Sequence, residues 1–263
     1  MDEVSAKPEI NILDIPLFAG DIKMAADILI DACVDQSVKN ACVSATGAHG
    51  LVHARRNPHF SQVLKSFFLN LPDGMPGVWV GKLKGAKKIK RCYGPDFFKH
   101  MMLVSADKDI NHFFCGGGSG VAEELRHAVK RKFFNGKVVG EYCPPFLPVD
   151  QYDYKAIADL VNATGAHVVW IGLSTPKQEE FAKRLSLFSN VSFIVAVGAA
   201  FDFHTDRLRQ APSWMQRIGM VWFFRLIMEP RRLFKRYVEI VPLFVYFNLL
   251  ETVSFVVNKS KKV

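Results

Sequence analysis

Short apolar segments alternate with segments of helical spacing between residues 40 and 197. Strands are expected at residues 40–46, 112–115, 137–142, 167–173 and 191–197. Helices are expected at 51–68, 121–134 and 154–163, and another should begin near Ser174 and Pro176. Strands that alternate with helices form a mostly parallel sheet whose two faces are covered. The sequence therefore predicts an α/β, Rossmann-like fold with covering helices.

The pattern changes after residue 206, which divides the chain into a core (1–206) and an appendage (207–263). Residues 206–237 mix aromatic side chains with many cations, which are Arg207, Arg209, Arg217, Arg225, Arg231, Arg232, Lys235 and Arg236. The following apolar stretch, 238–257, has the length of a membrane span. However, it contains Glu239, Pro242, Asn248 and Glu251, and each acid at mid-depth would cost about 2.5–3.5 kcal/mol.

We therefore expect an amphipathic helix that lies on an anionic membrane surface, with its apolar face in the lipid and its cations on the headgroups. Two alternatives stay open, because the same residues could cap the core or form an interface between copies of the chain. The formal net charge of +9 suits phosphate-bearing ligands as well as anionic lipid. Nucleic acid is disfavoured, because no recognised nucleic-acid-binding fold accompanies the charge. The five scattered cysteines include no CxxC pair, which argues against a disulfide framework or a zinc site and fits a reducing cytoplasm.

A glycine-rich turn, residues 116–120, follows one predicted strand and precedes a predicted helix. Backbone amides at such a turn suit a diphosphate group. The spacing is neither GxGxxG, since Val121 occupies the third glycine place, nor a P-loop. Glu141 lies about where a dinucleotide fold places its ribose-binding acid. These features indicate nucleotide binding only weakly, and a tight turn that requires glycine explains the loop equally well.

Polar residues follow two other predicted strands. Gln178 and Glu179 would lie in the first turn of a helix, and Asp202 follows the strand at 191–197. Ligands of open parallel sheets gather at these carboxyl ends. Asp73 lies in an Asp-Gly loop, which by itself is usually only a turn. The chain has no GxSxG or HExxH motif, and the histidines at 49, 53 and 59 lack the acid or cysteine partners of a metal site.

Taken together, seven blocks resemble the WecG/TagA/CpsF glycosyltransferases, glycosyltransferase family 26. The blocks are PDGMPGVW (72–79), RCYGPDFF (91–98), FFCGGGSG (113–120), PPF (144–146), WIGLSTPKQEEF (170–181), VGAAFDFHTDRLRQAPSWMQRIGMVWFFRL (197–226) and EPRRLFKRY (229–237). The resemblance covers residues 12–240 approximately and implies a fold of the GT-E type. It implies an inverting, metal-independent enzyme without a cofactor, which moves a hexose or N-acetylhexosamine from a UDP-sugar to an undecaprenyl-diphosphate-linked glycan. Such enzymes work peripherally at the cytoplasmic face of the bacterial inner membrane.

The resemblance also implies residue roles. Asp73 becomes the general base, glycine-loop amides and Arg207 or Arg225 would stabilise the leaving UDP, and Gln178 with Glu179 would hold the donor. The full predicted substrate-binding set is Thr46, Gly47, His49, Gly116, Gly117, Gly118, Ser119, Gly172, Pro176, Lys177, Gln178, Glu179, Asp202, Arg207, Arg225 and Arg232.

Two positions depart from the family pattern: Thr46 stands where members often have Asn, and Val221 where many have Glu. The Thr-Gly-x-His form resembles members that transfer glucose in exopolysaccharide synthesis. Two rival functions are a nicotinamide-dependent sugar-nucleotide oxidoreductase and a non-catalytic membrane-binding protein.

Overall fold

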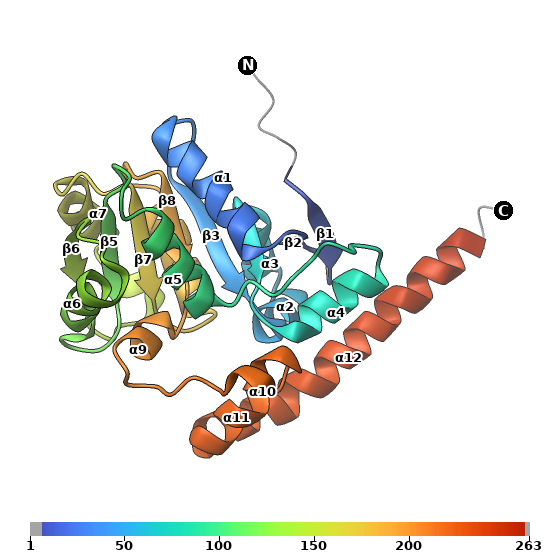
Figure 1. The fold of residues 1–263 in the computed structure, drawn as a ribbon. Helices are drawn as coiled ribbons and strands as arrows, with labels where there is room; N and C mark the ends of the chain where they lie inside the picture. The colour runs from blue at the N-terminus through green and yellow to red at the C-terminus, as the bar shows by residue number, and fades with distance from the viewer. Residues whose placement is uncertain (1–6, 261–263) are drawn as a thin grey trace.

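The core is a six-stranded sheet in the order β4-β3-β8-β7-β5-β6, in which every neighbouring pair is parallel (Figure 1). The computed structural model describes residues 7–260, so the outermost residues of the two predicted units, 1–6 and 261–263, lie outside the described residues. The strands are β3 (Ala41–Thr46), β4 (Leu69–Pro72), β5 (His112–Gly116), β6 (Val138–Tyr142), β7 (Val168–Gly172) and β8 (Phe193–Ala196). The predicted α/β fold is confirmed, as are all five predicted strands.

Helices cover both faces of this sheet. One face carries α2 (Ala48–Arg56), α3 (Pro58–Lys65), α7 (Tyr154–Asn162) and α8 (Lys177–Leu185). The other carries α1 (Ile22–Val34), α5 (Gly94–Val104), α6 (Val121–Phe133) and α9 (Ala200–His204). Within β7, Trp170 points into the second layer and Ile171 into the first. Because alternate side chains face opposite sides of a strand, a sheet buried on both sides needs uninterrupted apolar strands.

The single helix predicted over 51–68 is wrong. The structure has two helices there, α2 and α3, separated at Asn57 and Pro58. Proline cannot donate the hydrogen bond that would continue α2, and it is well suited to the first turn of α3. The Asn57 side chain accepts a hydrogen bond from the Phe60 amide at 3.1 Å and so caps the second helix.

A hairpin of β1 (Glu9–Ile12) and β2 (Ile15–Phe18) lies beside β4. Its turn residues, Leu13 and Asp14, have φ values of 52° and 65°, as a two-residue hairpin turn requires. After β4, α4 (Met75–Leu83) runs past this hairpin. A 3₁₀ turn, η1 (Val149–Gln151), precedes α7.

The appendage consists of α10 (Ser213–Arg217), α11 (Val221–Met228) and the long α12 (Pro230–Ser260) (Figure 1). Ile240 and Phe244 on one side of α12 are buried in the first core layer. Val245 and Leu249, on another side, are more than half exposed. Within residues 7–260, no helix is both long and apolar enough to cross a membrane.

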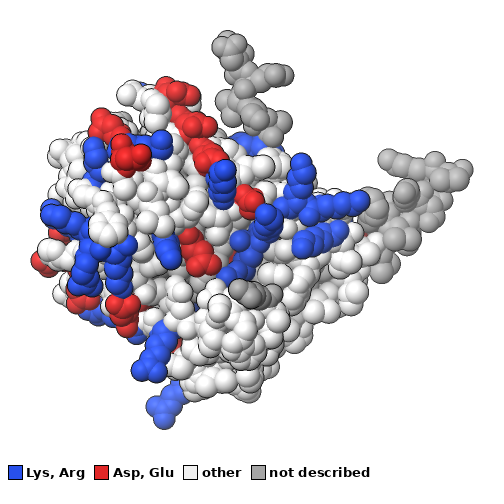
Figure 2. All heavy atoms as spheres, viewed as in Figure 1, with Lys and Arg blue, Asp and Glu red and all other residues white. Residues whose placement is uncertain are grey.

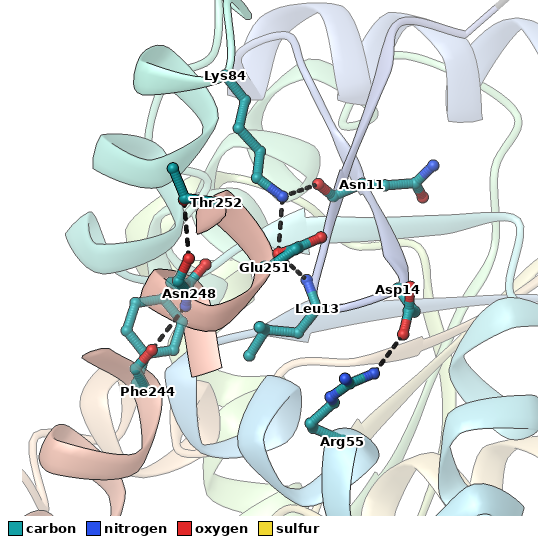
Figure 3. A network of polar contacts seen from close by, with 9 residues as sticks. All are labelled: Asn11, Leu13, Asp14, Arg55, Lys84, Phe244, Asn248, Glu251 and Thr252. Atoms are coloured by element: carbon teal, nitrogen blue, oxygen red, sulfur yellow. Dashed lines mark hydrogen bonds and ion pairs between the residues drawn. The ribbon is translucent and has the colours of Figure 1, made fainter. Parts of the chain in front are cut away.

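The two acids of the apolar stretch hold α12 against the core. Glu239 forms an ion pair with Arg56 on α2. Glu251 forms one with Lys84 at 2.8 Å and accepts a hydrogen bond from the Leu13 amide at 3.2 Å (Figure 3). One side of α12 therefore caps the core, which was one of the alternatives left open by the sequence.

Candidate active site

The carboxyl ends of all six strands of the sheet open into one cleft of about 2380 Å³. Parallel strands bring these ends to the same edge of the sheet, where ligands of open α/β folds bind. The appendage forms the opposite wall, through residues of α11 and α12. The cleft exceeds the roughly 300–1,000 Å³ of a usual small-molecule pocket, so it has room for two substrates at once.

Asp73 lies at the inner end of this cleft, directly after β4. Its amide donates to the Thr46 carbonyl at 3.2 Å, and its Oδ1 accepts from the Gly94 amide at 2.7 Å. Burial raises the pKa of Asp73 to about 6, although the Gly94 amide and the cations of Arg225 and Arg91 oppose the shift. A carboxylate whose pKa lies just below neutral pH is well suited to act as a general base.

The glycine-rich turn packs tightly against the end of β7. Gly116 and Gly117 have φ values of 131° and 76°, and the Gly117 amide donates to the Gly172 carbonyl at 2.9 Å. A Cβ on Gly116 would lie 2.7 Å from that carbonyl oxygen. Glycine is therefore required here for conformation. Gly117, Gly118 and Ser119 line the cleft, so the turn can also offer backbone amides to an anion.

Glu141, the acid suggested for a ribose, forms an ion pair with Arg126 at 3.2 Å on the edge strand β6. It is absent from the cleft lining that residues 7–260 provide. The structure thus removes the main support for a dinucleotide site.

A buried hydrogen-bond network joins β3, the start of α8 and the loop after β8 at the floor of the cleft. Glu179 Oε1 accepts from Ser44 Oγ at 3.0 Å, Thr175 Oγ1 at 2.8 Å and Gln178 Nε2 at 2.9 Å. Gln178 Oε1 in turn accepts from the Gly198 amide at 2.9 Å. The Oε2 atom of Glu179 is buried without a hydrogen-bond partner among residues 7–260, and burial raises the pKa of this acid. Gln178 reaches the cleft, whereas Glu179 supports it from below.

Three arginines of the appendage line the cleft: Arg225, Arg232 and Arg236. Arg225 and Arg232 both pair with Glu229, at 3.5 Å in the case of Arg225. Burial and the charges of Arg232 and Arg225 lower the pKa of Arg236. Three cations that line one cleft repel one another, and a bound anion would relieve this repulsion. Arg207 instead forms an ion pair with Glu124 at 2.7 Å, outside the cleft lining described for residues 7–260.

The predicted site residues fall into two groups. Those that line the cleft are Gly47, His49, Asp73, Gly117, Gly118, Ser119, Gly172, Gln178, Asp202, Arg225 and Arg232. Those that lie behind its surface or outside it are Thr46, Gly116, Pro176, Lys177, Glu179 and Arg207. Thr46 bonds to Asn70 Oδ1 at 3.4 Å, and Lys177 donates to the Leu147 carbonyl and lies 4.2 Å from the Phe146 ring centroid.

Residues that the sequence reasoning did not single out also line the cleft. Arg91 reaches Asp96 at 3.3 Å and Gln216 Oε1 at 3.1 Å, and its guanidinium lies 4.8 Å from the Tyr93 ring centroid. Arg91 therefore links the core to the appendage next to Asp73. The block RCYGPDFF, at 91–98, contained the signal, but none of its three lining residues, Arg91, Tyr93 and Pro95, was singled out.

His49 also lines the cleft, and burial together with the nearby Arg236 and His53 lowers its pKa to about 4. It is therefore neutral at physiological pH and can donate or accept a hydrogen bond. Within the described residues, 7–260, no group of three or more His, Cys, Asp or Glu side chains is placed to hold a metal ion.

The chain is similar in sequence to known proteins. A family model described as "Glycosyl transferase WecG/TagA/CpsF family" matches residues 10–256. An N-acetylglucosaminyldiphosphoundecaprenol N-acetyl-beta-D-mannosaminyltransferase of Bacillus spizizenii is 30% identical over 199 residues, which are 76% of this chain and 75% of that protein. A protein of the same name from Bacillus subtilis (strain 168) is 26% identical over 222 residues, which are 84% of each chain.

Proposed function

Because the chain belongs to the WecG/TagA/CpsF glycosyltransferases, we propose that it transfers a hexose or N-acetylhexosamine, with inversion, from a UDP-sugar to an undecaprenyl-diphosphate-linked glycan. The product would serve cell-surface or exopolysaccharide synthesis. The observation that carries the proposal is the position of Asp73: a carboxylate with a pKa of about 6 lies in the same cleft as three arginines and a glycine turn.

The mechanism follows from these groups. Asp73 takes the proton of an acceptor hydroxyl while that oxygen attacks the anomeric carbon from the face opposite the UDP. The bond between the anomeric carbon and the UDP oxygen breaks as the new glycosidic bond forms, so the anomeric configuration inverts. Negative charge that develops on the leaving diphosphate is met by the amides of Gly118 and Ser119 and by Arg225 and Arg232.

The two Bacillus relatives suggest which donor to test first. Their names describe transfer of N-acetylmannosamine to an N-acetylglucosaminyl-diphosphoundecaprenol. The Thr46-Gly47-x-His49 sequence favours glucose instead, through its resemblance to exopolysaccharide enzymes. We give the N-acetylhexosamine donors priority in the test because of the names of the two relatives.

A lipid-linked acceptor requires the protein to work at a membrane, and we propose peripheral docking at the cytoplasmic face. Exposed apolar side chains of α11, including Ile227 and Met228, support this location. The end of α4 and the segment that follows it add exposed lysines, among them Lys82, Lys87 and Lys88. Figure 2 shows Lys and Arg gathered over this segment beside a largely uncharged surface over α10–α12. Each such cation near an anionic surface contributes about 1 kcal/mol.

A donor screen tests the proposal. The purified chain would be mixed with a synthetic prenyl-diphosphate-linked N-acetylglucosamine and a panel of UDP-sugars, and UDP release would be measured. We expect release with one donor class. Arg225→Gln should then reduce kcat roughly 10²-fold, as the loss of one hydrogen-bond donor to the transition state does in other enzymes. The matched variant Arg207→Gln should stay within a few-fold of the wild type, since Arg207 pairs with Glu124 outside the cleft lining described. No release with any donor would contradict the function.

A further inference from the structure

The cleft continues away from Asp73 as an apolar groove between α4 and α12. Trp79 and Leu83 line it from α4, Val241, Val245 and Leu249 line it from α12, and Ile10 of β1 lines it as well. In the described structure Leu83 is 87% exposed and Leu249 is 61% exposed. Large apolar side chains exposed in a row along a concave surface indicate an apolar ligand.

The groove has a direction. On α4, Met75 lies next to the Asp73 loop and Lys84 follows the far end of the helix. On α12, Arg232 lies near the start of the helix, and Glu251 follows it by a helical length of roughly 28 Å. The inner end is thus charged and the outer part apolar within one continuous cleft.

The two walls are joined near the outer end. Lys84 reaches across to Glu251 at 2.8 Å and donates to the Asn11 carbonyl at 2.9 Å (Figure 3). Glu251 also accepts from the Leu13 amide on the hairpin at 3.2 Å. These contacts join α4, α12 and the hairpin at the outer end of the groove.

We propose that this groove binds the proximal isoprene units of the acceptor's polyprenyl chain, with the acceptor diphosphate at the arginine end. The inference rests on the proposed function, because it assigns a place to the lipid of that acceptor. A ligand with a diphosphate head and an apolar tail matches both the charge and the polarity of the cleft from end to end. A flat bilayer surface or a second copy of the chain would leave the continuity with Arg232 and Asp73 unexplained.

Neighbouring residues of α12 offer a matched pair of variants. Val245 lines the groove, whereas Tyr246 is outside the lining that the described residues form. Their exposed fractions are nearly equal, 52% and 55%. A general loss of apolar surface from α12 would affect both positions alike, while a ligand in the groove depends on Val245 alone.

The first experiment measures binding without catalysis. Calorimetry in detergent-free buffer would compare farnesyl diphosphate with dimethylallyl diphosphate on the full chain. We expect farnesyl diphosphate to bind at least tenfold more tightly and with a negative heat-capacity change, because its longer chain removes more apolar surface from water. Val245→Ser and Leu249→Ser should each weaken farnesyl diphosphate binding about fivefold and leave dimethylallyl diphosphate binding unchanged. Tyr246→Ser should change neither.

The second experiment measures transfer to acceptors with chains of five, ten and fifteen carbons, below their critical micelle concentrations. KM should fall with each added unit, and Val245→Ser should reduce that dependence without changing kcat. Turnover with a KM independent of chain length would overturn the groove and leave the function intact. Tight farnesyl diphosphate binding without UDP release from any donor would instead support the groove and contradict the function.

Two further results would overturn the groove. Equal effects of Val245→Ser and Tyr246→Ser on vesicle binding, without discrimination between the two diphosphates, would make this side of α12 a membrane contact. A change in oligomeric state of Val245→Ser, without farnesyl diphosphate binding to the wild type, would make it an interface between copies.

Discussion

Replacing Asp73 by Asn tests the site through the free energy of unfolding as well as through activity. Burial raises the pKa of this carboxyl from 3.8 to about 6. Between these two values the folded protein binds more protons than the unfolded chain, so stability falls as the pH rises through this window. This difference in pKa lowers the free energy of unfolding by roughly 3 kcal/mol at pH 8, where Asp73 is ionised in both the folded and the unfolded state. At pH 4 the same calculation gives a loss of stability of less than about 1 kcal/mol.

The asparagine side chain of the Asp73→Asn variant cannot ionise, while its carbonyl oxygen can still accept from the Gly94 amide. We therefore expect this variant to be more stable than the wild type by up to about 3 kcal/mol at pH 8 and nearly equal to it at pH 4. Urea unfolding at the two pH values measures this difference. Asp21→Asn is the control of opposite sign, because hydrogen bonds from the Met24 amide and Lys90 lower the pKa of Asp21.

The same variant should lose transfer activity by about 10²–10⁴-fold, the usual contribution of a positioned base. UDP affinity should remain within a few-fold, since the arginines and the glycine turn are unchanged. In the wild type, kcat/KM should rise with pH and reach half of its plateau near pH 6. Near-normal turnover of Asp73→Asn would refute the base assignment. Equal or lower stability than the wild type at pH 8 would refute the buried-charge argument.

Three further variants test the surroundings of the site. Gly116→Ala should lower the free energy of unfolding, measured in urea, by about 2 kcal/mol or more, because its Cβ would lie 2.7 Å from the Gly172 carbonyl oxygen. Gly136→Ala is the control, because a Cβ there would have no atom within 4 Å. Glu179→Ala should lower the free energy of unfolding by about 2–4 kcal/mol in the same assay and raise KM for the donor, because three side-chain donors lose their acceptor. An unchanged KM would show that the network is structural only. Glu251→Gln should change the free energy of unfolding by less than about 1 kcal/mol but increase amide hydrogen exchange at the end of α12. High salt should have the same effect on exchange in the wild type. Unchanged exchange would mean that the ion pair does not hold the helix.

Local patterns were sufficient for most of the core. Apolar runs of strand length and glycine at the turn after β5 each act through contacts within a few residues. Five of the six strands of the parallel sheet and the helices α6, α7 and α8 could therefore be predicted without knowledge of the fold, and the seven blocks identified the family. The sequence analysis did not predict the strands β1, β2 and β4 or the helices α1, α4, α5 and α9. It also joined α2 and α3 into one helix, which Asn57 and Pro58 divide.

The roles of the acids, by contrast, depended on partners far away in the sequence. Glu239 and Glu251 could be recognised as unfavourable for a membrane span, but their partners, Arg56 and Lys84, lie more than 150 residues away. Likewise, Glu179 was expected to contact the donor, and only packing against Ser44 on β3 shows that it lies below the cleft. Side-chain type and spacing therefore determined the fold and the family. Burial and long-range pairing, which exist only after the chain has folded, decided which polar groups face the cleft and which support it.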